Sequence, residues 1–293
     1  MNKSCLIGFL MCSAFSLVVQ AATDGAHITK TISQIERKKG IKRTIQYRPD
    51  GNDFVCVNGK NRYTRALYGG ITDFRIETSD RPVFAAYKPK DSKHICFRLQ
   101  CGNQSIALDS LKFCEARYRA GRRTYRLTDP LLGKGELNIS VLAFPDAEGG
   151  IWRFTMKDMP EGALLHCYIS EIRAKNLSRN GDMGADRADS FDAPQLPKEQ
   201  KHYKLSLDGT TAYIVVEDQE LRLPALVEGT SLYDKSEKWR SEIESSLQIS
   251  TPDPYFNPLG GALAAAADGI WDGKIWLHGA IGWQWWLARS EDG

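Results

Sequence analysis

The clearest structural signal in this chain lies in residues 151–157, which read Ile-Trp-Arg-Phe-Thr-Met-Lys. Side chains of a β-strand point alternately to its two faces, so Trp152, Phe154 and Met156 share one face and the polar residues share the other. Residues 137–144 and 164–172, on either side, show the same alternation. The three segments predict neighbouring half-buried strands of an antiparallel meander.

Short strands separated by turn residues extend outward from this segment over residues 41–227. Arg48-Pro49-Asp50-Gly51 is predicted to be one of the turns. Asn-Gly and Asp-Gly dipeptides tolerate the positive φ angles of tight hairpin turns, so two hairpins are predicted. These hairpins join residues 54–57 to 62–68 through Asn58-Gly59, and residues 205–207 to 212–216 through Asp208-Gly209.

The predicted fold is mainly β: an antiparallel, supersandwich-like β-sandwich followed by a short C-terminal α-helical segment. No helical periodicity occurs before about residue 230, which argues against parallel βαβ units. Residues 176–200 lack apolar periodicity and are rich in Asn, Asp, Gly and Pro. They are predicted to leave the sheet as a long loop that lies beside a ligand site.

The period changes after residue 230, where Trp239, Ile243 and Leu247 recur at four-residue spacing and predict an amphipathic linker helix over residues 230–250. Prolines then break the helix. Asn257 is predicted to cap a second helix, which has Pro258 at its first position and runs from Leu259 to Trp271. Because this segment is rich in Ala and Gly and poor in charge, it is predicted to be buried.

The start of the chain predicts export. Lys3 precedes an apolar run over residues 6–19, and Val19-Gln20-Ala21 offers the small residues that a signal peptidase requires. We therefore expect residues 1–21 to be a signal peptide. The expected location is periplasmic or cell-surface associated in a Gram-negative bacterium, without a membrane span, since no later segment is long and apolar enough.

Composition narrows the classes of partner. A net charge of +3 with 26% charged residues gives no electrostatic reason to expect nucleic acid. Five cysteines follow the signal peptide, and Cys96 with Cys101 is a possible hairpin disulfide, although buried free thiols are the commoner outcome. The histidines lack zinc spacing, and neither a metal nor another cofactor is predicted. The oligomeric state is not predicted.

Five of the seven tryptophans lie within the last 23 residues, close to His278. Indole faces stack on the apolar faces of sugar rings, so a glycan platform is one interpretation, and packing between helices is the other. Glycoside hydrolysis needs two carboxylates. Asp253, Asp268 and Asp272 are the candidates here, each of which also fits a turn or cap role, and no catalytic pair can be assigned.

Two other groups of charged residues carry weaker hypotheses. Five arginines between residues 117 and 126 alternate with Tyr118 and Tyr125, and arginine binds carboxylates through two parallel hydrogen bonds. An acidic sugar is therefore conceivable there, although a solvated sheet face is the simpler interpretation. The acids at 182, 186, 189 and 192 could surround Ca²⁺, but their spacing differs from that of an EF-hand loop.

A family resemblance rests on residues 251–263, TPDPYFNPLGGAL, followed by Ala267-Asp268-Gly269-Ile270-Trp271 and by residues 278–283, HGAIGW. Residues 61–70, NRYTRALYGG, add to it. The chain resembles an exported bacterial family of unknown function, domain of unknown function 4450, in which a β-sandwich precedes a six-hairpin (α/α)₆ glycosidase-like barrel. The resemblance implies a glycan or oligosaccharide ligand.

The resemblance implies a domain order of signal peptide (1–21), β-sandwich (22–229), linker helix (230–250) and the first helices of an incomplete barrel (251–293). We expect the chain to be the N-terminal portion of a secreted glycoside hydrolase-like protein, truncated and inactive as it stands. The alternative is a non-catalytic carbohydrate-binding or structural β-sandwich. The residues expected to contact sugar are Asp253, Tyr255, Asp268, Trp271, His278 and Trp283.

Overall fold

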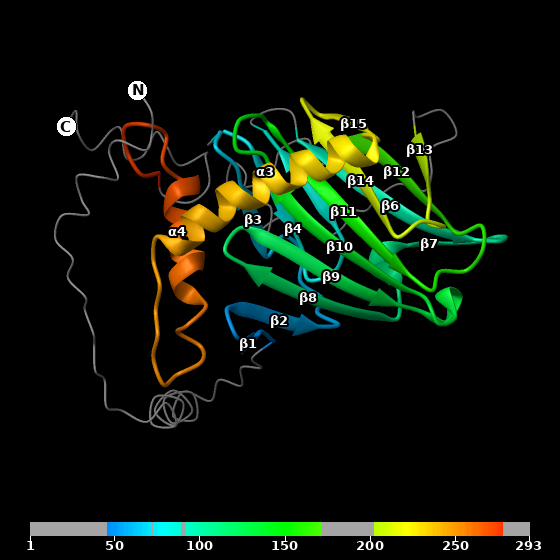
Figure 1. Ribbon diagram of the computed structural model, residues 1–293, viewed down its shortest axis with the longest axis horizontal. Helices are drawn as coiled ribbons and strands as arrows, with labels where there is room; N and C mark the ends of the chain where they lie inside the picture. The colour runs from blue at the N-terminus through cyan, green and yellow to red at the C-terminus, as the bar shows by residue number, and fades with distance from the viewer. Residues whose placement is uncertain (1–45, 72, 89–91, 172–201, 278–293) are drawn as a thin grey trace.

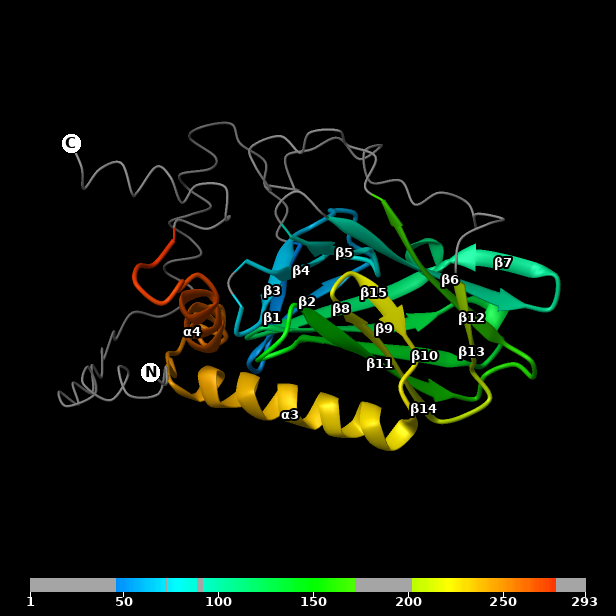
Figure 2. The same ribbon diagram turned by 90° about the horizontal axis from the view of Figure 1, so that it is seen from above.

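The computed structural model describes residues 46–71, 73–88, 92–171 and 202–277. In these residues two antiparallel sheets pack face to face, as Figures 1 and 2 show. The prediction of a mainly β, antiparallel sandwich with a short helical segment after it is confirmed. No helix in the described part of the chain has the length and apolar character needed to cross a membrane.

Sheet A has the strand order β1-β2-β8-β9-β10-β11-β14-β15. It contains a meander of β8 to β11, which includes the first two strands of the predicted one, residues 137–144 and 151–157. The prediction that the third segment, residues 164–172, lies beside them is wrong, because β12 belongs to the other sheet and β11 pairs with β14 instead. The prediction for residues 151–157 is confirmed: Trp152, Phe154 and Met156 are buried, and the residues between them face outward. The strands are β1 (Arg48–Asp50), β2 (Asp53–Val57), β8 (Phe113–Arg119), β9 (Arg122–Thr128), β10 (Glu136–Ala143), β11 (Gly149–Lys157), β14 (Thr211–Glu217) and β15 (Glu220–Arg222).

Sheet B has the order β13-β12-β6-β5-β4-β3, with β7 also paired to β6. Two short 3₁₀ turns, Leu108–Ser110 and Pro130–Leu132, lie in the loops before β8 and β10. The strands of sheet B are β3 (Arg65–Tyr68), β4 (Arg75–Thr78), β5 (Phe84–Tyr87), β6 (Lys93–Cys101), β7 (Gln104–Ala107), β12 (Leu164–Glu171) and β13 (His202–Ser206). Along the described chain, the connections β2–β3, β7–β8, β11–β12 and β13–β14 cross between the sheets.

The core lies between the two sheets and is centred on aromatic rings. Trp152 of sheet A is fully buried, and its ring meets that of Phe84 of sheet B edge-on at 5.7 Å. Phe97 and Phe154 make a second edge-on pair across the same space at 5.5 Å. The five cysteines of the described residues are all free. The expectation of buried thiols is therefore confirmed for four of them, and Cys101 is partly exposed.

The hairpin predicted at Asn58-Gly59 is wrong. Residues 54–57 pair with β1 and β8, whereas β3 belongs to sheet B. Asn58 has a positive φ of 49°, as the dipeptide suggested, but it continues the pairing with β8. Its backbone N–H donates to the Cys114 carbonyl at 2.8 Å, and its side-chain oxygen accepts from the Cys114 N–H at 2.9 Å. Residues 48–50 of the predicted turn form β1 instead, and the turn itself lies at residues 51–52, between β1 and β2.

The hairpin predicted at Asp208-Gly209 is also wrong, because β13 pairs with β12 in sheet B and β14 pairs with β11 in sheet A. This dipeptide therefore carries the chain from one sheet to the other. The Leu207 N–H donates to the Ala163 carbonyl at 2.9 Å, which holds the start of the crossing. The loop predicted over residues 176–200 lies outside the described residues.

Helix α3 (Leu226–Ser245) lies along the outer face of sheet A, over β10, β11 and β14 (Figures 1 and 2). It begins and ends about five residues earlier than the predicted linker helix, so residues 226–227 start the helix instead of ending the strands. Gly229 permits its close approach, because a Cβ there would lie 2.4 Å from the ring of Tyr213. The Tyr233 hydroxyl lies 2.6 Å from that of Ser140 on β10.

Helix α4 (Leu259–Gly269) crosses the end of the sandwich beside α3 and β3. Asn257 is not its N-cap: the Asn257 side-chain oxygen accepts from the Thr251 N–H at 2.8 Å, which closes the preceding loop. The prediction of a fully buried helix is wrong for one face, since Leu263 is 54% exposed. The other face packs closely, because a Cβ on Gly269 would lie 2.3 Å from Tyr68.

Candidate functional site

A groove of about 490 Å³ opens at the end of the sandwich, between α4 with its preceding loop and the strands β2, β3 and β8. Its walls combine four aromatic rings, one guanidinium group and the aliphatic side chains of α4. Sugar-binding sites have this mixture of apolar walls and a few polar groups. The groove is lined by Tyr47, Phe54, Arg65, Tyr118, Tyr255, Leu259, Ala262 and Leu263.

A second hollow of about 220 Å³, the inner cavity, adjoins the groove. Arg65 and Tyr118 line both spaces and so form a wall common to them. The inner cavity lies where α3 and α4 meet β3 and the turn between β8 and β9. Its lining is Thr64, Arg65, Ala66, Tyr68, Tyr118, Ala120, Gly121, Trp239, Arg240, Ile243, Ala265 and Ala266.

Arg65 stands at the centre of this site, between two aromatic rings. Its guanidinium carbon lies 5.0 Å from the ring centre of Tyr47 and 5.6 Å from that of Tyr118. Ring faces attract cations, so both tyrosines stabilise this position of the charge. The Nη1 group donates to the Thr64 carbonyl at 2.6 Å. Among the described residues, no carboxylate forms an ion pair with Arg65.

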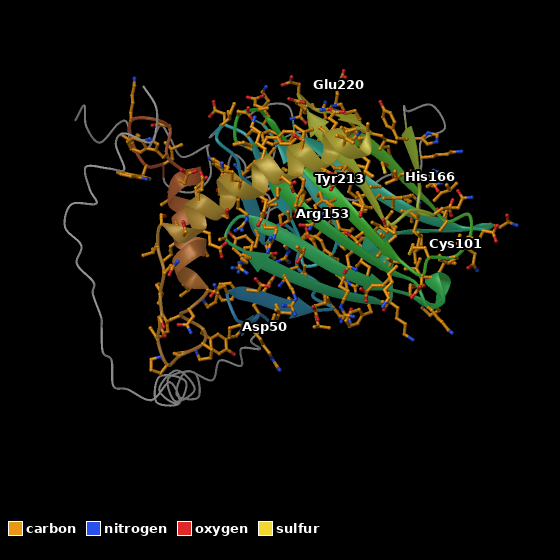
Figure 3. The ribbon with its side chains drawn as sticks, viewed as in Figure 1. Asp50, Cys101, Arg153, His166, Tyr213 and Glu220 are labelled. Carbon is orange, nitrogen blue, oxygen red and sulfur yellow. The ribbon has the colours of Figure 1, made fainter. Side chains whose placement is uncertain are left out.

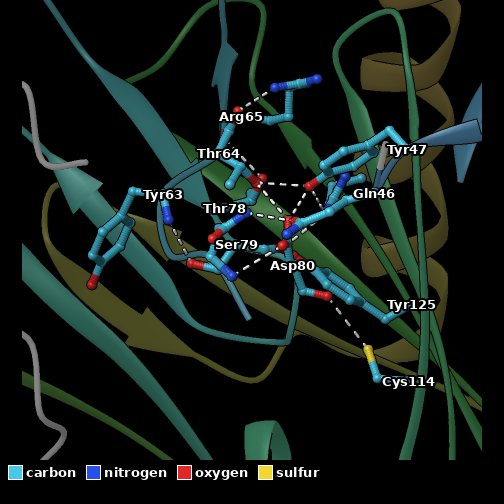
Figure 4. A network of polar contacts seen from close by, with 12 residues as sticks. Gln46, Tyr47, Tyr63, Thr64, Arg65, Thr78, Ser79, Asp80, Cys114 and Tyr125 are labelled. Atoms are coloured by element: carbon cyan, nitrogen blue, oxygen red, sulfur yellow. Dashed lines mark hydrogen bonds and ion pairs between the residues drawn. The ribbon is translucent and has the colours of Figure 1, made fainter. Parts of the chain in front are cut away.

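Buried polar residues hold Tyr47 in place (Figure 4). The Tyr47 hydroxyl donates to Asp80, whose side chain is fully buried. Asp80 also accepts from the Thr64 hydroxyl at 3.2 Å and from the Asn61 N–H at 3.0 Å. Burial raises the pKa of Tyr47, which remains a neutral donor. This ring is therefore fixed before any ligand arrives.

A buried arginine also contacts the polar residues that hold Tyr47. Arg123 of β9 is fully buried, and its Nη2 lies 3.8 Å from Asp80 and 2.9 Å from the Ser79 carbonyl. The Tyr125 hydroxyl donates to that carbonyl at 2.8 Å. Burying a charge is costly unless an opposite charge lies next to it. Arg123 and Asp80 supply each other with such a partner, so we interpret them as a structural pair. Arg123 lines neither the groove nor the inner cavity.

An ion-pair network fixes the helices against the sandwich on the far side of the inner cavity. Arg240 of α3 donates to Glu237 at 2.7 Å and to Glu244 at 2.8 Å. Arg119 and Arg122, which flank the turn between β8 and β9, donate to Glu244 and Glu237 at 2.7 Å each. All three guanidinium groups therefore have carboxylate partners, unlike Arg65.

Of the four predicted sugar-contacting residues that the structure describes, one lies in the groove. Tyr255 lines it and is 37% exposed. Asp253 is buried in the preceding turn, where its carboxylate accepts from the Tyr255 N–H at 2.9 Å, so it acts as a turn residue. Asp268 lies on α4 outside both lining sets. His278 and Trp283 lie outside the described residues.

Trp271 is placed away from the groove, beyond the end of α4. Its ring lies 4.5 Å from that of Trp276, and the two residues also form a short β-bridge. Trp276 is 58% exposed. The bend between them is held by Asp272, whose carboxylate accepts from two backbone N–H groups that lower its pKa. Asp272 is therefore a turn residue, as its position before Gly273 suggested.

Among the residues that the structure describes, no aspartate or glutamate lines the groove or the inner cavity. Hydrolysis of a glycosidic bond needs an acid and a second carboxylate on either side of it, and these two spaces do not provide them. The described residues also contain no group of three or more His, Cys, Asp or Glu side chains placed to hold a metal ion. The chemistry that this site offers is stacking and charge recognition.

Of the described groove residues, the sequence predicted only Tyr255 as a sugar contact, although it drew attention to two segments that supply others. Arg65 falls within residues 61–70, which carried part of the family resemblance, and Tyr118 belongs to the arginine-rich run. Strand alternation could have placed Arg123 inside, because it shares a face with Tyr125 and Leu127. Asp80 and Tyr47 had no local signal. They lie 33 residues apart and meet only through the fold.

A second polar cluster covers part of sheet B. Arg75 donates to Glu77 at 2.5 Å and lies 3.8 Å from the ring centre of Tyr87, and all three side chains are buried. The Tyr63 hydroxyl lies 3.5 Å from His94 on the same sheet. Figure 3 labels two further polar side chains, Arg153 beside α3, which is partly exposed, and His166 on β12, which is buried. None of these residues contributes to the groove.

Comparison with protein families gives one match. Residues 89–217 match the family model described as Domain of unknown function (DUF4450). The DUF4450 match runs from just before β6 to the end of β14 and so includes strands of both sheets. Of the groove residues, only Tyr118 falls within it, and α3 and α4 follow it. No curated protein matches the chain.

Proposed function

We propose that the described part of this chain is a carbohydrate-binding unit of an exported glycan-degrading protein and is not itself catalytic. The observation that carries this proposal is the groove lining: its described residues supply four aromatic rings and one guanidinium, and none of them is a carboxylate. Aromatic rings bind the apolar faces of sugars, whereas glycoside hydrolysis requires acidic groups. The family resemblance of residues 251–271 supports the glycan class.

A second candidate function is that of the N-terminal portion of a glycoside hydrolase-like protein, in which this unit packs against a catalytic helical domain. The exposed apolar residues around α4 favour it. Phe256, in the loop before α4, is 41% exposed, and Leu263 of α4 is 54% exposed. The two functions are compatible, because a binding groove next to a catalytic domain would hold substrate for it.

Binding to a panel of soluble polysaccharides, measured by affinity electrophoresis and then by calorimetry, tests the proposal. Tyr255→Ala removes one exposed ring of the groove and is expected to weaken binding roughly three- to tenfold, the scale of one stacked aromatic contact. Trp276→Ala is the matched control, since it removes an exposed ring outside the groove. No binding to any glycan would refute the proposal. Loss of binding in the Trp276→Ala variant alone would show that sugar binds at the Trp271–Trp276 pair and not in the groove.

A further inference from the structure

We infer that the groove selects sugars that carry a carboxylate and that Arg65 binds this group. The inference rests on the proposed carbohydrate-binding function and names the class of sugar. Its first support is the charge of the groove: among the described lining residues, Arg65 alone is charged at neutral pH. An uncompensated guanidinium in an apolar, aromatic groove favours an anionic ligand.

The second support is the contrast between Arg65 and the other arginines at this end of the sandwich. Arg117 is paired with Glu115 at 2.9 Å, Arg119 with Glu244 at 2.7 Å and Arg122 with Glu237 at 2.7 Å. These residues belong to the arginine-rich run in which an acidic sugar site was conceivable. Their carboxylate partners already lie within the protein, so these three arginines are occupied in ion pairs. Arg65 has no such partner among the described residues.

The third support is preorganisation. Arg65 belongs to β3, where its carbonyl accepts from the Thr78 hydroxyl at 2.8 Å, and its guanidinium is placed by the rings of Tyr47 and Tyr118. One Nη1 hydrogen bond goes to the Thr64 carbonyl. The remaining N–H donors can form the paired hydrogen bonds that match a carboxylate. A side chain fixed in advance loses little conformational entropy on binding.

A hexuronic acid satisfies both features of the groove. Its ring presents an apolar face to an aromatic side chain of the groove such as Tyr255, and its carboxylate suits the guanidinium of Arg65, which lines the same groove. A sulfate ester offers similar oxyanion chemistry, but carboxylate is planar and matches the guanidinium fork. The inference therefore names uronic acid-containing glycans as the ligand.

Calorimetric titration of the full chain with polygalacturonate, its methyl ester and dextran sulfate tests the inference. We expect polygalacturonate to bind about tenfold more tightly than the methyl ester, with an affinity that falls as salt is raised. Arg65→Met should remove this tenfold preference, so that the variant binds polygalacturonate and its methyl ester with similar affinity. Arg65→Lys, which keeps the charge but not the planar fork, should give an intermediate preference and guards against misfolding of the Met variant.

Arg98→Gln is the matched control, because Arg98 lies on β6 beside β7, at the end of the sandwich opposite α4 (Figure 1). It should retain the preference. Equal binding of acid and ester by the wild type would overturn the inference while the carbohydrate-binding function stands. Tighter binding of dextran sulfate than of polygalacturonate would overturn the carboxylate assignment. Absence of binding to every glycan would instead refute the proposed function.

Discussion

Trp152 lies where the aromatic rings of the two sheets meet. Its indole is fully buried, with Phe84 edge-on at 5.7 Å and Phe97 at 6.3 Å. Its Nε1 group has no hydrogen-bond partner within the described part of the chain, so the residue contributes through packing and retains the cost of one buried unpaired donor. Truncation of this side chain would leave a large cavity between the sheets.

Trp152→Ala is therefore expected to lower the free energy of unfolding by about 3–5 kcal/mol, as measured by urea denaturation. Trp152→Phe should cost much less, because it keeps a ring in the core and removes the unpaired donor. Trp276→Ala, at an exposed position, should change stability by less than about 0.5 kcal/mol. A similar loss for Trp152→Ala and Trp276→Ala would contradict this account of the core.

Individual residues also show where sequence patterns stop being informative. The inward side chains of residues 151–157 were predictable because strand alternation is a local property. The role of Asp253 was not: the same residue fits a ligand site and a turn, and only the hydrogen bond to the Tyr255 N–H separates the two. The position of Arg65 between two rings depends on Tyr47 and Tyr118, which come from other strands and loops and cannot be paired from sequence.

At the scale of the elements, α3 is attached to the turn between β8 and β9 by Glu244. Burial raises the pKa of Glu244, but hydrogen bonds from Arg119 and Arg240 outweigh it, and the net pKa is lowered below 4.5. The folded state therefore binds this proton less readily than the unfolded state does. Its contribution to stability is complete above pH 4.5 and is lost as the pH falls through the lowered folded-state pKa.

Glu244→Gln tests this dependence. Near pH 6 the variant is expected to unfold with about 1 kcal/mol less free energy than the wild type. As the pH falls below 4.5, the difference should shrink, because the wild-type carboxylate becomes protonated. Urea denaturation curves at a series of pH values measure it. A difference that stays constant from pH 6 to pH 3 would show that the ion pair contributes nothing.

The attachment of α4 depends on Gly269. A Cβ at this position would lie 2.3 Å from Tyr68, so Gly269→Ala is expected to displace the end of α4 and lower stability by about 1–3 kcal/mol. Gly209→Ala is the control, since no atom lies within 4 Å of a Cβ added there. Thermal unfolding and amide exchange of α4 are the measurements. Unchanged exchange in the Gly269 variant would contradict the tight packing.

The elements themselves were predicted better than their partners. Strands β10, β11 and β12 and both helices fall close to their expected positions, because hydrophobic periodicity is local. The two hairpins failed because Asn58-Gly59 and Asp208-Gly209 report only the backbone conformation of a turn. Which sheet the next strand joins is a tertiary property. The strand after Asn58-Gly59 is β3 of sheet B, and Asp208-Gly209 likewise joins two strands of different sheets.

For the whole molecule, the mainly β class was predictable from the spacing of strands and turns, and the two packed sheets confirm it. The strand order was not, since β8 pairs with β2 across more than 50 residues of intervening chain. The groove depends on the same long-range order. Its walls come from β2, β3, β8 and α4, and no local sequence pattern in these segments predicts that they lie together.

Because the chain crosses four times between the sheets, the segment matched by the family model, residues 89–217, does not coincide with a unit that can fold alone. A fragment limited to residues 89–217 contains β6 to β14 but lacks β1 to β5, so β6 and β8 would each lose a pairing partner. It would also lack Leu67, Ile76 and Phe84, which fill the space between the sheets. We expect this fragment to aggregate or remain unfolded on expression, as shown by circular dichroism and size-exclusion chromatography, whereas residues 46–277 should fold. The segment that matches the family model is therefore not expected to be a separate folding unit. The chain passes repeatedly between the two sheets, and the match covers only part of this path.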